Sequence, residues 1–208
     1  MRSALGLAVL VLAACSSQPR TPVEEDIAVV TTPAAPQHSA FGDAYTAYAA
    51  DPGSAAKQRA YFDAFPNDYA ALRKTFGFEE VSEDSVVFAE YYEQGNDMIG
   101  AFFKLDSLPM EGIAAKAISI ARNGVWQGDG VGYFQHFLMK DFEKAPSAYL
   151  DILGSLARAD QAGFWRFYTD GPEAFPQEDK SRLRALLAKE PGHLAVLDSV
   201  LALPRLGH

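Results

Sequence analysis

The spacing of apolar residues from Phe41 onward constrains the fold of this chain more than any other feature. Tyr149, Ile152, Leu153 and Leu156 recur at positions i, i+3, i+4 and i+7, which is the pattern of one helix face. The same stripe repeats in two later segments. Its members there are Leu183, Leu186 and Leu187, followed by Leu194, Leu197, Val200 and Leu201. The spacing predicts two successive helices at the end of the chain.

Less regular stripes of the same period fill most of the remaining sequence. They cover residues 44–49, 61–65, 69–76, 86–92, 98–103, 113–121, 131–142 and 164–168. Pro66-Asn67-Asp68 can open a helix, Asn123-Gly124 can close one, and Pro191-Gly192 separates the last two. No window alternates well enough to indicate a sheet. We therefore predict an all-α fold: a single domain of about nine or ten short helices, as an orthogonal bundle or an irregular helical-hairpin array.

Composition and motifs exclude several classes of protein. The chain is 49% hydrophobic and 22% charged, as folded globular proteins are. A single cysteine excludes an intrachain disulfide, and with four histidines it excludes a zinc knuckle. The net charge of -9 argues against nucleic-acid binding. No Gly-x-Ser-x-Gly elbow, His-Glu-x-x-His helix or phosphate-binding Gly-x-x-x-x-Gly-Lys loop is present. We assign no catalytic residue, metal ligand or cofactor.

The first residues carry an export signal. Arg2 precedes an apolar run over residues 4–12 that is too short to span a bilayer, and Leu12-Ala13-Ala14-Cys15 follows. This tetrapeptide resembles the lipobox of bacterial lipoproteins. The resemblance implies cleavage after Ala14 and lipidation of Cys15. Ser16, where an aspartate would signal retention in the inner membrane, implies sorting to the outer membrane with the domain facing the periplasm.

The chain thus divides into three predicted parts. Residues 1–14 are a signal peptide, residues 15–40 a lipid-anchored tether, and residues 41–208 the helical globular domain. The tether carries four prolines and an acidic Glu24-Glu25-Asp26 patch, and we expect no ordered structure in it, except that Ile27 to Val30 can pair as a short strand. A chain of that length spans roughly 25 to 30 Å, so it holds the domain clear of the membrane.

Acidic residues concentrate in one stretch, residues 79–97, which contains no lysine or arginine. Its seven members are Glu79, Glu80, Glu83, Asp84, Glu90, Glu93 and Asp97. Concentrated charge of one sign steers a partner of the opposite sign, and an aromatic ring among charges, here Tyr92, is a frequent binding anchor. The alternative is a solvated face that serves only solubility.

A second region, residues 123–136, places four glycines around Trp126. It can form a recognition loop with a tryptophan anchor. The alternative is a helix end, a turn and the next helix start, with Trp126 in the core.

Two classes of function follow. In the first, the protein is a membrane-tethered periplasmic binding module that captures a basic protein, such as an immunity or inhibitor lipoprotein that neutralises an envelope-targeting effector. The lipid is then its only contact with the membrane. An envelope-assembly scaffold fits the same features. In the second class, it is an envelope enzyme acting on peptidoglycan or a small metabolite through carboxylates such as Glu90 and Glu93, three residues apart on one helix face.

Overall fold

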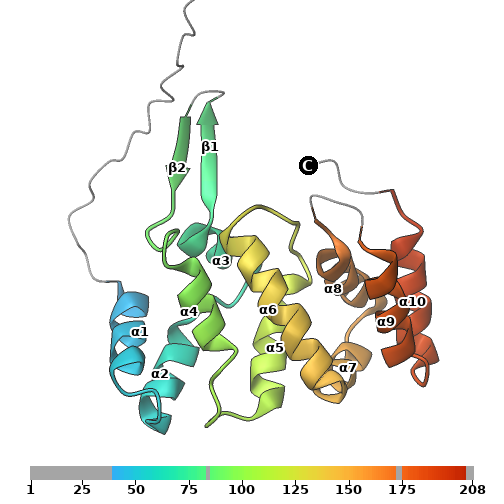
Figure 1. Ribbon diagram of the computed structural model, residues 1–208, viewed down its shortest axis with the longest axis horizontal. Helices are drawn as coiled ribbons and strands as arrows, with labels where there is room; N and C mark the ends of the chain where they lie inside the picture. Colours follow the sequence, from blue (N-terminus) through green and yellow to red (C-terminus); the bar gives the residue numbers. More distant parts are fainter. Residues whose placement is uncertain (1–38, 83–84, 172–174, 205–208) are drawn as a thin grey trace, which may run out of the picture.

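A computed structural model describes residues 39–82, 85–171 and 175–204, and these form ten helices and one β-hairpin (Figure 1). The helices are α1 (Ala40–Ala50), α2 (Ala55–Ala64), α3 (Tyr69–Phe76), α4 (Gly95–Phe102), α5 (Met110–Ala121), α6 (Gly130–Lys144), α7 (Pro146–Ser155), α8 (Arg158–Thr169), α9 (Gln177–Leu186) and α10 (Pro191–Leu201). The strands are β1 (Phe78–Ser82) and β2 (Ser85–Phe88). The predicted all-α class is confirmed.

Local sequence signals set the starts of several helices. The side chains of Ser39, Ser54 and Asp68 accept backbone N–H groups of the first turns of α1, α2 and α3. Proline opens α7 at Pro146 and α10 at Pro191, where its missing N–H costs no intrahelical bond. The predicted helix start at Pro66-Asn67-Asp68 therefore lies where α3 begins.

The helices pack mainly in pairs that are not consecutive in sequence. Apart from α1 against α2, the closest packing joins α4 with α6, α5 with α7 and α8 with α10. Figure 1 shows the resulting arrangement, with α1 and α2 at one end of the body and α9 and α10 at the other. None of the helices in the described ranges is long and apolar enough to cross a membrane.

Aromatic side chains fill much of the core. Phe65 and Phe102 stack with ring centroids 4.2 Å apart, which joins α2 to α4. Between α6 and α8, Phe142 makes an edge contact with the fully buried Trp165 at 5.5 Å. The predicted stripes supply the aliphatic part: Leu153, Leu187 and Leu197 are fully buried. Leu153 lies on the core side of α7, Leu187 at the end of α9 and Leu197 on the core side of α10.

One segment differs from its prediction. The helix expected over residues 86–92 is absent, and an antiparallel hairpin with a following turn takes its place. Val86 and Val87 are β-branched and lie opposite Glu80 and Glu79 of β1, so a strand suits them better than a helix. The expectation that no sheet is present was wrong.

The export signal, Cys15 and nearly all of the tether lie outside the described residues. The described chain begins at Ser39, and α1 starts at Ala40, at the predicted junction between tether and domain.

Candidate protein-binding hairpin

The hairpin stands out from the helical body, and Figure 1 shows β1 and β2 projecting beyond the helices. Phe78 lies opposite Phe88, Glu79 opposite Val87 and Glu80 opposite Val86. The register then shifts by one residue before Ser82 pairs with Ser85, which indicates a bulge at Val81. Because opposed residues share a face, Phe78, Phe88 and Glu80 lie on one side of the hairpin, and Glu79 and Val87 on the other.

Large apolar side chains on the hairpin are open to solvent. Val81 is 66% exposed, Val87 48% and Phe88 43%. These are three of the six exposed large hydrophobic residues in the described chain. Isolated exposed hydrophobic residues are ordinary, but the hairpin gathers half of those in the described chain, with Val87 on one face and Phe88 on the other.

Side chains from two distant segments meet at the base of the hairpin. The Tyr92 ring lies 4.4 Å, centroid to centroid, from Phe88, and its hydroxyl donates to the Asp129 carboxylate. The Gln127 side-chain amide donates to the Phe78 carbonyl oxygen at 3.3 Å. The acidic stretch and the 123–136 region, separate in the sequence, thus form one site.

Asp129 has the only positive φ among the non-glycine residues described, 54°. This part of backbone space favours glycine, so the aspartate is held at an energetic cost. Its neighbour Gly130 cannot carry a side chain, because a Cβ there would collide with the Phe76 carbonyl. The close approach of α3 and α6 and the bond to Tyr92 together fix the Asp129 backbone. The hydrogen bond that the Tyr92 hydroxyl donates to Asp129, with burial as a smaller cause, raises the pKa of Tyr92 to about 12.

The residues singled out in the acidic stretch occupy three different elements. Glu79 and Glu80 are exposed on β1, and Asp97 is exposed in the first turn of α4. Glu90 and Glu93 are exposed in the turn over residues 89–94, beside the half-buried Tyr92. Glu83 and Asp84 lie outside the described residues. The expectation that Glu90 and Glu93 share a helix face was wrong, because the chain turns there to leave the hairpin.

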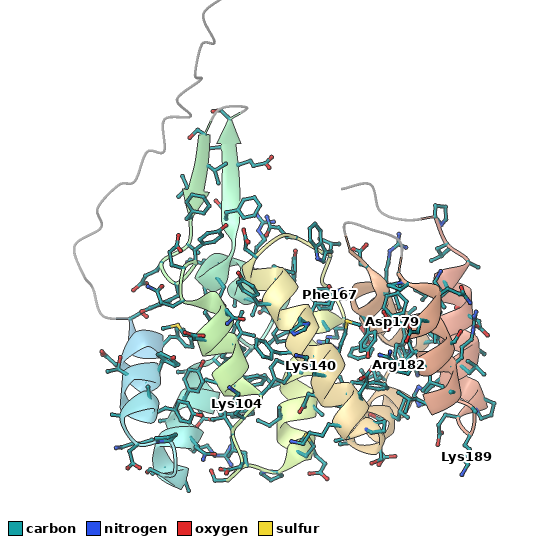
Figure 2. The ribbon with its side chains drawn as sticks, viewed as in Figure 1. Lys104, Lys140, Phe167, Asp179, Arg182 and Lys189 are labelled. Carbon is teal, nitrogen blue, oxygen red and sulfur yellow. The ribbon has the colours of Figure 1, made fainter. Side chains whose placement is uncertain are left out.

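Asp97 faces a different part of the molecule from the hairpin. It lines a cavity of about 340 Å³ between α1, α4 and α6, together with Tyr45, Tyr48 and Lys104 (Figure 2 labels Lys104). Burial, with the nearby Asp97 carboxylate as a smaller cause, raises the pKa of Tyr45.

Trp126 lies in the loop between α5 and α6 and is half-buried. Its backbone N–H donates to the Asp170 carboxylate at 3.0 Å, which ties this loop to the end of α8. Tyr69 binds the same loop by donating to the Val125 carbonyl oxygen at 2.8 Å. The loop that supports the hairpin is therefore held from two sides.

A groove lies beside the hairpin, and no sequence pattern predicted it. It has a volume of about 570 Å³ and lies between α3 and the strands, and its lining includes Tyr69, Phe78 and Val87. Arg73 and Lys74 stand at its α3 side, and the Arg73 guanidinium lies 3.7 Å from the Glu79 carboxylate. The basic pair in α3 was a signal in the sequence, but nothing local indicates that a hairpin folds back beside it.

Two features of the described chain bear on metal binding and nucleophilic catalysis. This part of the chain contains no cluster of three or more histidine, cysteine, aspartate or glutamate residues arranged to hold a metal ion. One Ser-x-x-Lys sequence, from Ser54 to Lys57, is present. The Ser54 hydroxyl caps α2, however, and the Lys57 ammonium pairs with Asp51 at 3.1 Å, so the two side chains do not form a nucleophile and base.

Comparison of the chain with protein-family models, curated proteins and solved structures found no match.

Proposed function

We propose that this protein is a lipid-anchored binding module that captures a basic protein in the periplasm through its hairpin and the adjoining turn. The observation that carries the proposal is the projecting hairpin, with exposed Val87 and Phe88 among exposed acidic residues. Apolar contact area supplies affinity, and the carboxylates steer the partner and select against acidic competitors.

The charge distribution supports a basic partner. Seven of the 27 acidic residues of the chain lie in the 79–97 stretch, which has no lysine or arginine to offset them. Of the acidic side chains described there, only Glu79 makes an ion pair, with Arg73, and at exposed positions such pairs are weak. Arg73 and Lys74 of α3 lie beside the hairpin and offset part of this charge, and the exposed Glu80, Glu90 and Glu93 supply the negative field that a partner would meet.

The proposed lipid anchor determines where in the cell the hairpin acts. The proposed tether joins the domain at Ser39, whose hydroxyl lies 2.7 Å from the Tyr91 hydroxyl, directly after the hairpin. With Cys15 lipidated in the outer membrane, the tether would reach the domain beside the segment that follows the hairpin. An immunity or inhibitor role, in which the hairpin blocks a basic effector that attacks the wall or membrane, fits this arrangement; an assembly scaffold uses the same surface.

A matched pair of charge-reversal variants tests the proposal. One variant carries Glu80→Lys, Glu90→Lys and Glu93→Lys; the control carries Glu111→Lys, Asp151→Lys and Glu190→Lys, all exposed and away from the hairpin. Both change the net charge equally. Immobilised wild type, hairpin variant and control are exposed to envelope extract, and the retained proteins are identified by mass spectrometry.

We expect a basic protein that the wild type and the control retain and the hairpin variant loses. With that protein purified, its association rate with the wild type should fall steeply as salt rises, because screening shortens the reach of the field to about 8 Å at physiological ionic strength. Tyr92→Ala should weaken binding by about 2 kcal/mol if the ring is an anchor. Equal loss in both charge variants would mean that only net charge matters and that the hairpin is not the site.

A further inference from the structure

The backbone ladder shows which peptide groups of the hairpin point outward. The Ala89 N–H donates to the Gly77 carbonyl at 2.9 Å, and the Tyr91 N–H to the Thr75 carbonyl at 3.2 Å. Given the register of Phe78 opposite Phe88, Gly77 and Ala89 are directly opposed and hydrogen-bonded, whereas Thr75 belongs to α3 and its bond to Tyr91 lies outside the ladder. Hydrogen-bonded pairs alternate with non-bonded pairs in an antiparallel ladder. The pairs Phe78/Phe88 and Glu80/Val86 are therefore non-bonded, and their N–H and C=O groups point away from the hairpin.

An independent contact supports this assignment. The Phe78 carbonyl, which the ladder directs outward, accepts the Gln127 side-chain amide. The outer edge of β1 is thus occupied at its base by the 123–129 loop. In the chain as described, no further strand joins this two-stranded sheet, so the outer edge of β2 remains open at Val86 and Phe88. An open edge is a template for strand addition.

We propose that the outer edge of β2 binds an extended segment of the partner as a third, added strand, and that this segment alternates apolar residues with lysine or arginine. The inference rests on the proposed function and specifies how the partner is held. Val86 and Phe88 would contact side chains on one face of the added strand and Val87 those on the other, while Glu80, Glu90 and Glu93 would attract its basic residues.

Charge selects this occupant over a segment of the same protein. A second copy would bring its own exposed Glu80, Glu90 and Glu93 to the same surface, so the two acidic surfaces would repel each other. The tether carries Glu24, Glu25 and Asp26 against one basic residue, Arg20, so it is acidic as well. A basic extended segment can pair with the open backbone groups of β2 and also neutralise the surrounding carboxylates, which neither a second copy nor the acidic tether does.

A synthetic probe separates strand addition from plain charge attraction. The probe is a fluorescein-labelled peptide of nine alternating lysine and valine residues, and its affinity for the full chain in detergent micelles is measured by fluorescence anisotropy. Two further peptides carry N-methyl groups on alternate residues, one on the lysines and one on the valines. Methylation removes N–H donors but leaves the charge unchanged, and only one of the two parities can face β2.

We expect one methylated peptide to bind at least about tenfold more weakly than the unmodified probe and the other to bind nearly as well, because only one of them loses the N–H groups that would donate to β2. Val86→Pro should give a similar loss, because it deletes an outward N–H and leaves the ladder to β1 intact, as proline permits on an edge strand. Val86→Thr keeps the N–H and the branched side chain and should bind as the wild type does. A helical circular dichroism spectrum unchanged by either substitution shows that the body stays folded.

Equal binding of all three peptides, with loss only in the Glu80, Glu90 and Glu93 reversal, would overturn strand addition while the acidic binding surface stood. Loss on methylation with no effect of the reversal would overturn the basic character of the occupant. Binding that neither change affects would overturn both this inference and the proposed function.

Discussion

At the scale of single residues, Asp129 departs most from ordinary backbone geometry. Its φ of 54° is sterically unfavourable for any residue with a Cβ, and such positions cost of order 1–3 kcal/mol. Strained residues persist where the surroundings fix them, and here the Tyr92 hydroxyl holds the carboxylate beside the hairpin. The hydrogen bond from Tyr92 therefore helps to hold the strained Asp129 and positions the Tyr92 ring against Phe88.

Substitution of Asp129 tests this balance. Asp129→Gly should leave the free energy of unfolding nearly unchanged, because relief of about 1 kcal/mol of strain offsets the lost hydrogen bond. In a Tyr92→Phe background, where that bond is already absent, Asp129→Gly should stabilise the protein by about 1 kcal/mol. Urea unfolding of the four proteins in the cycle measures both values. Destabilisation by glycine in both backgrounds would show that the Asp129 backbone carries no strain.

Three buried tyrosines should make the stability of the protein fall in alkali. Burial is the main cause that raises the pKa of Tyr61, Tyr149 and Tyr168 well above 10, with nearby charges adding to it. Below about pH 10 the folded and unfolded chains both keep these protons; above it the unfolded chain loses them first, so stability should fall as the pH rises. Tyr61→Phe should remove about 1.4 kcal/mol per pH unit from that slope. A free energy of unfolding that stays constant from pH 9 to 11.5 would contradict this account.

At the scale of elements, the sequence was most informative where the stripe was long and regular. The stripes of α7, α9 and α10 predicted the helices and their buried side, as Leu153, Leu183 and Leu197 show. The hairpin also left a signal: the segments before and after Glu83-Asp84 are rich in β-branched and aromatic residues, which favour strands. Val86, Ala89 and Tyr92 happen to follow a three-residue spacing as well, and a short apolar run cannot distinguish helix from strand.

The contacts that assemble the site could not be predicted from local patterns. Tyr92 and Asp129 are separated by 37 residues, and Phe78 and Gln127 by 49. They meet because α3 and α4 both pack on α6, which places the hairpin between them beside the loop that opens α6. The residue types in the acidic stretch indicated a binding surface, but only the packing of α6 shows which of them surround the hairpin.

The two faces of α7 give a test of the packing. Leu153→Ala should destabilise the domain by about 2–5 kcal/mol, because this fully buried side chain leaves a cavity. The adjacent Ile152 is only partly buried, so Ile152→Ala should cost clearly less. Thermal or urea unfolding followed at 222 nm checks both. Equal losses would mean that α7 is rotated about its axis from the orientation described.

At the scale of the whole molecule, the proposed anchor governs where the hairpin acts. Cys15→Ser should abolish lipidation and release the protein from the membrane fraction, since no other lipid site is expected. Metabolic labelling with palmitate should mark the wild type and not the variant. Because the change lies far in sequence from the described domain, thermal unfolding of the released protein should match that of the wild type. A soluble, unlabelled wild type would end the lipoprotein interpretation.

Site-specific photo-crosslinking in living cells tests the hairpin most directly. A photoreactive phenylalanine analogue replaces Val87 on the hairpin in one full-length variant, and Lys189 in another, an exposed residue at the far end of the body (Figure 2). We predict an adduct with a basic envelope protein from position 87 and none from position 189. That adduct should disappear when Glu80, Glu90 and Glu93 are changed to lysine. No adduct at position 87, or the same adduct from both positions, would contradict capture through the hairpin.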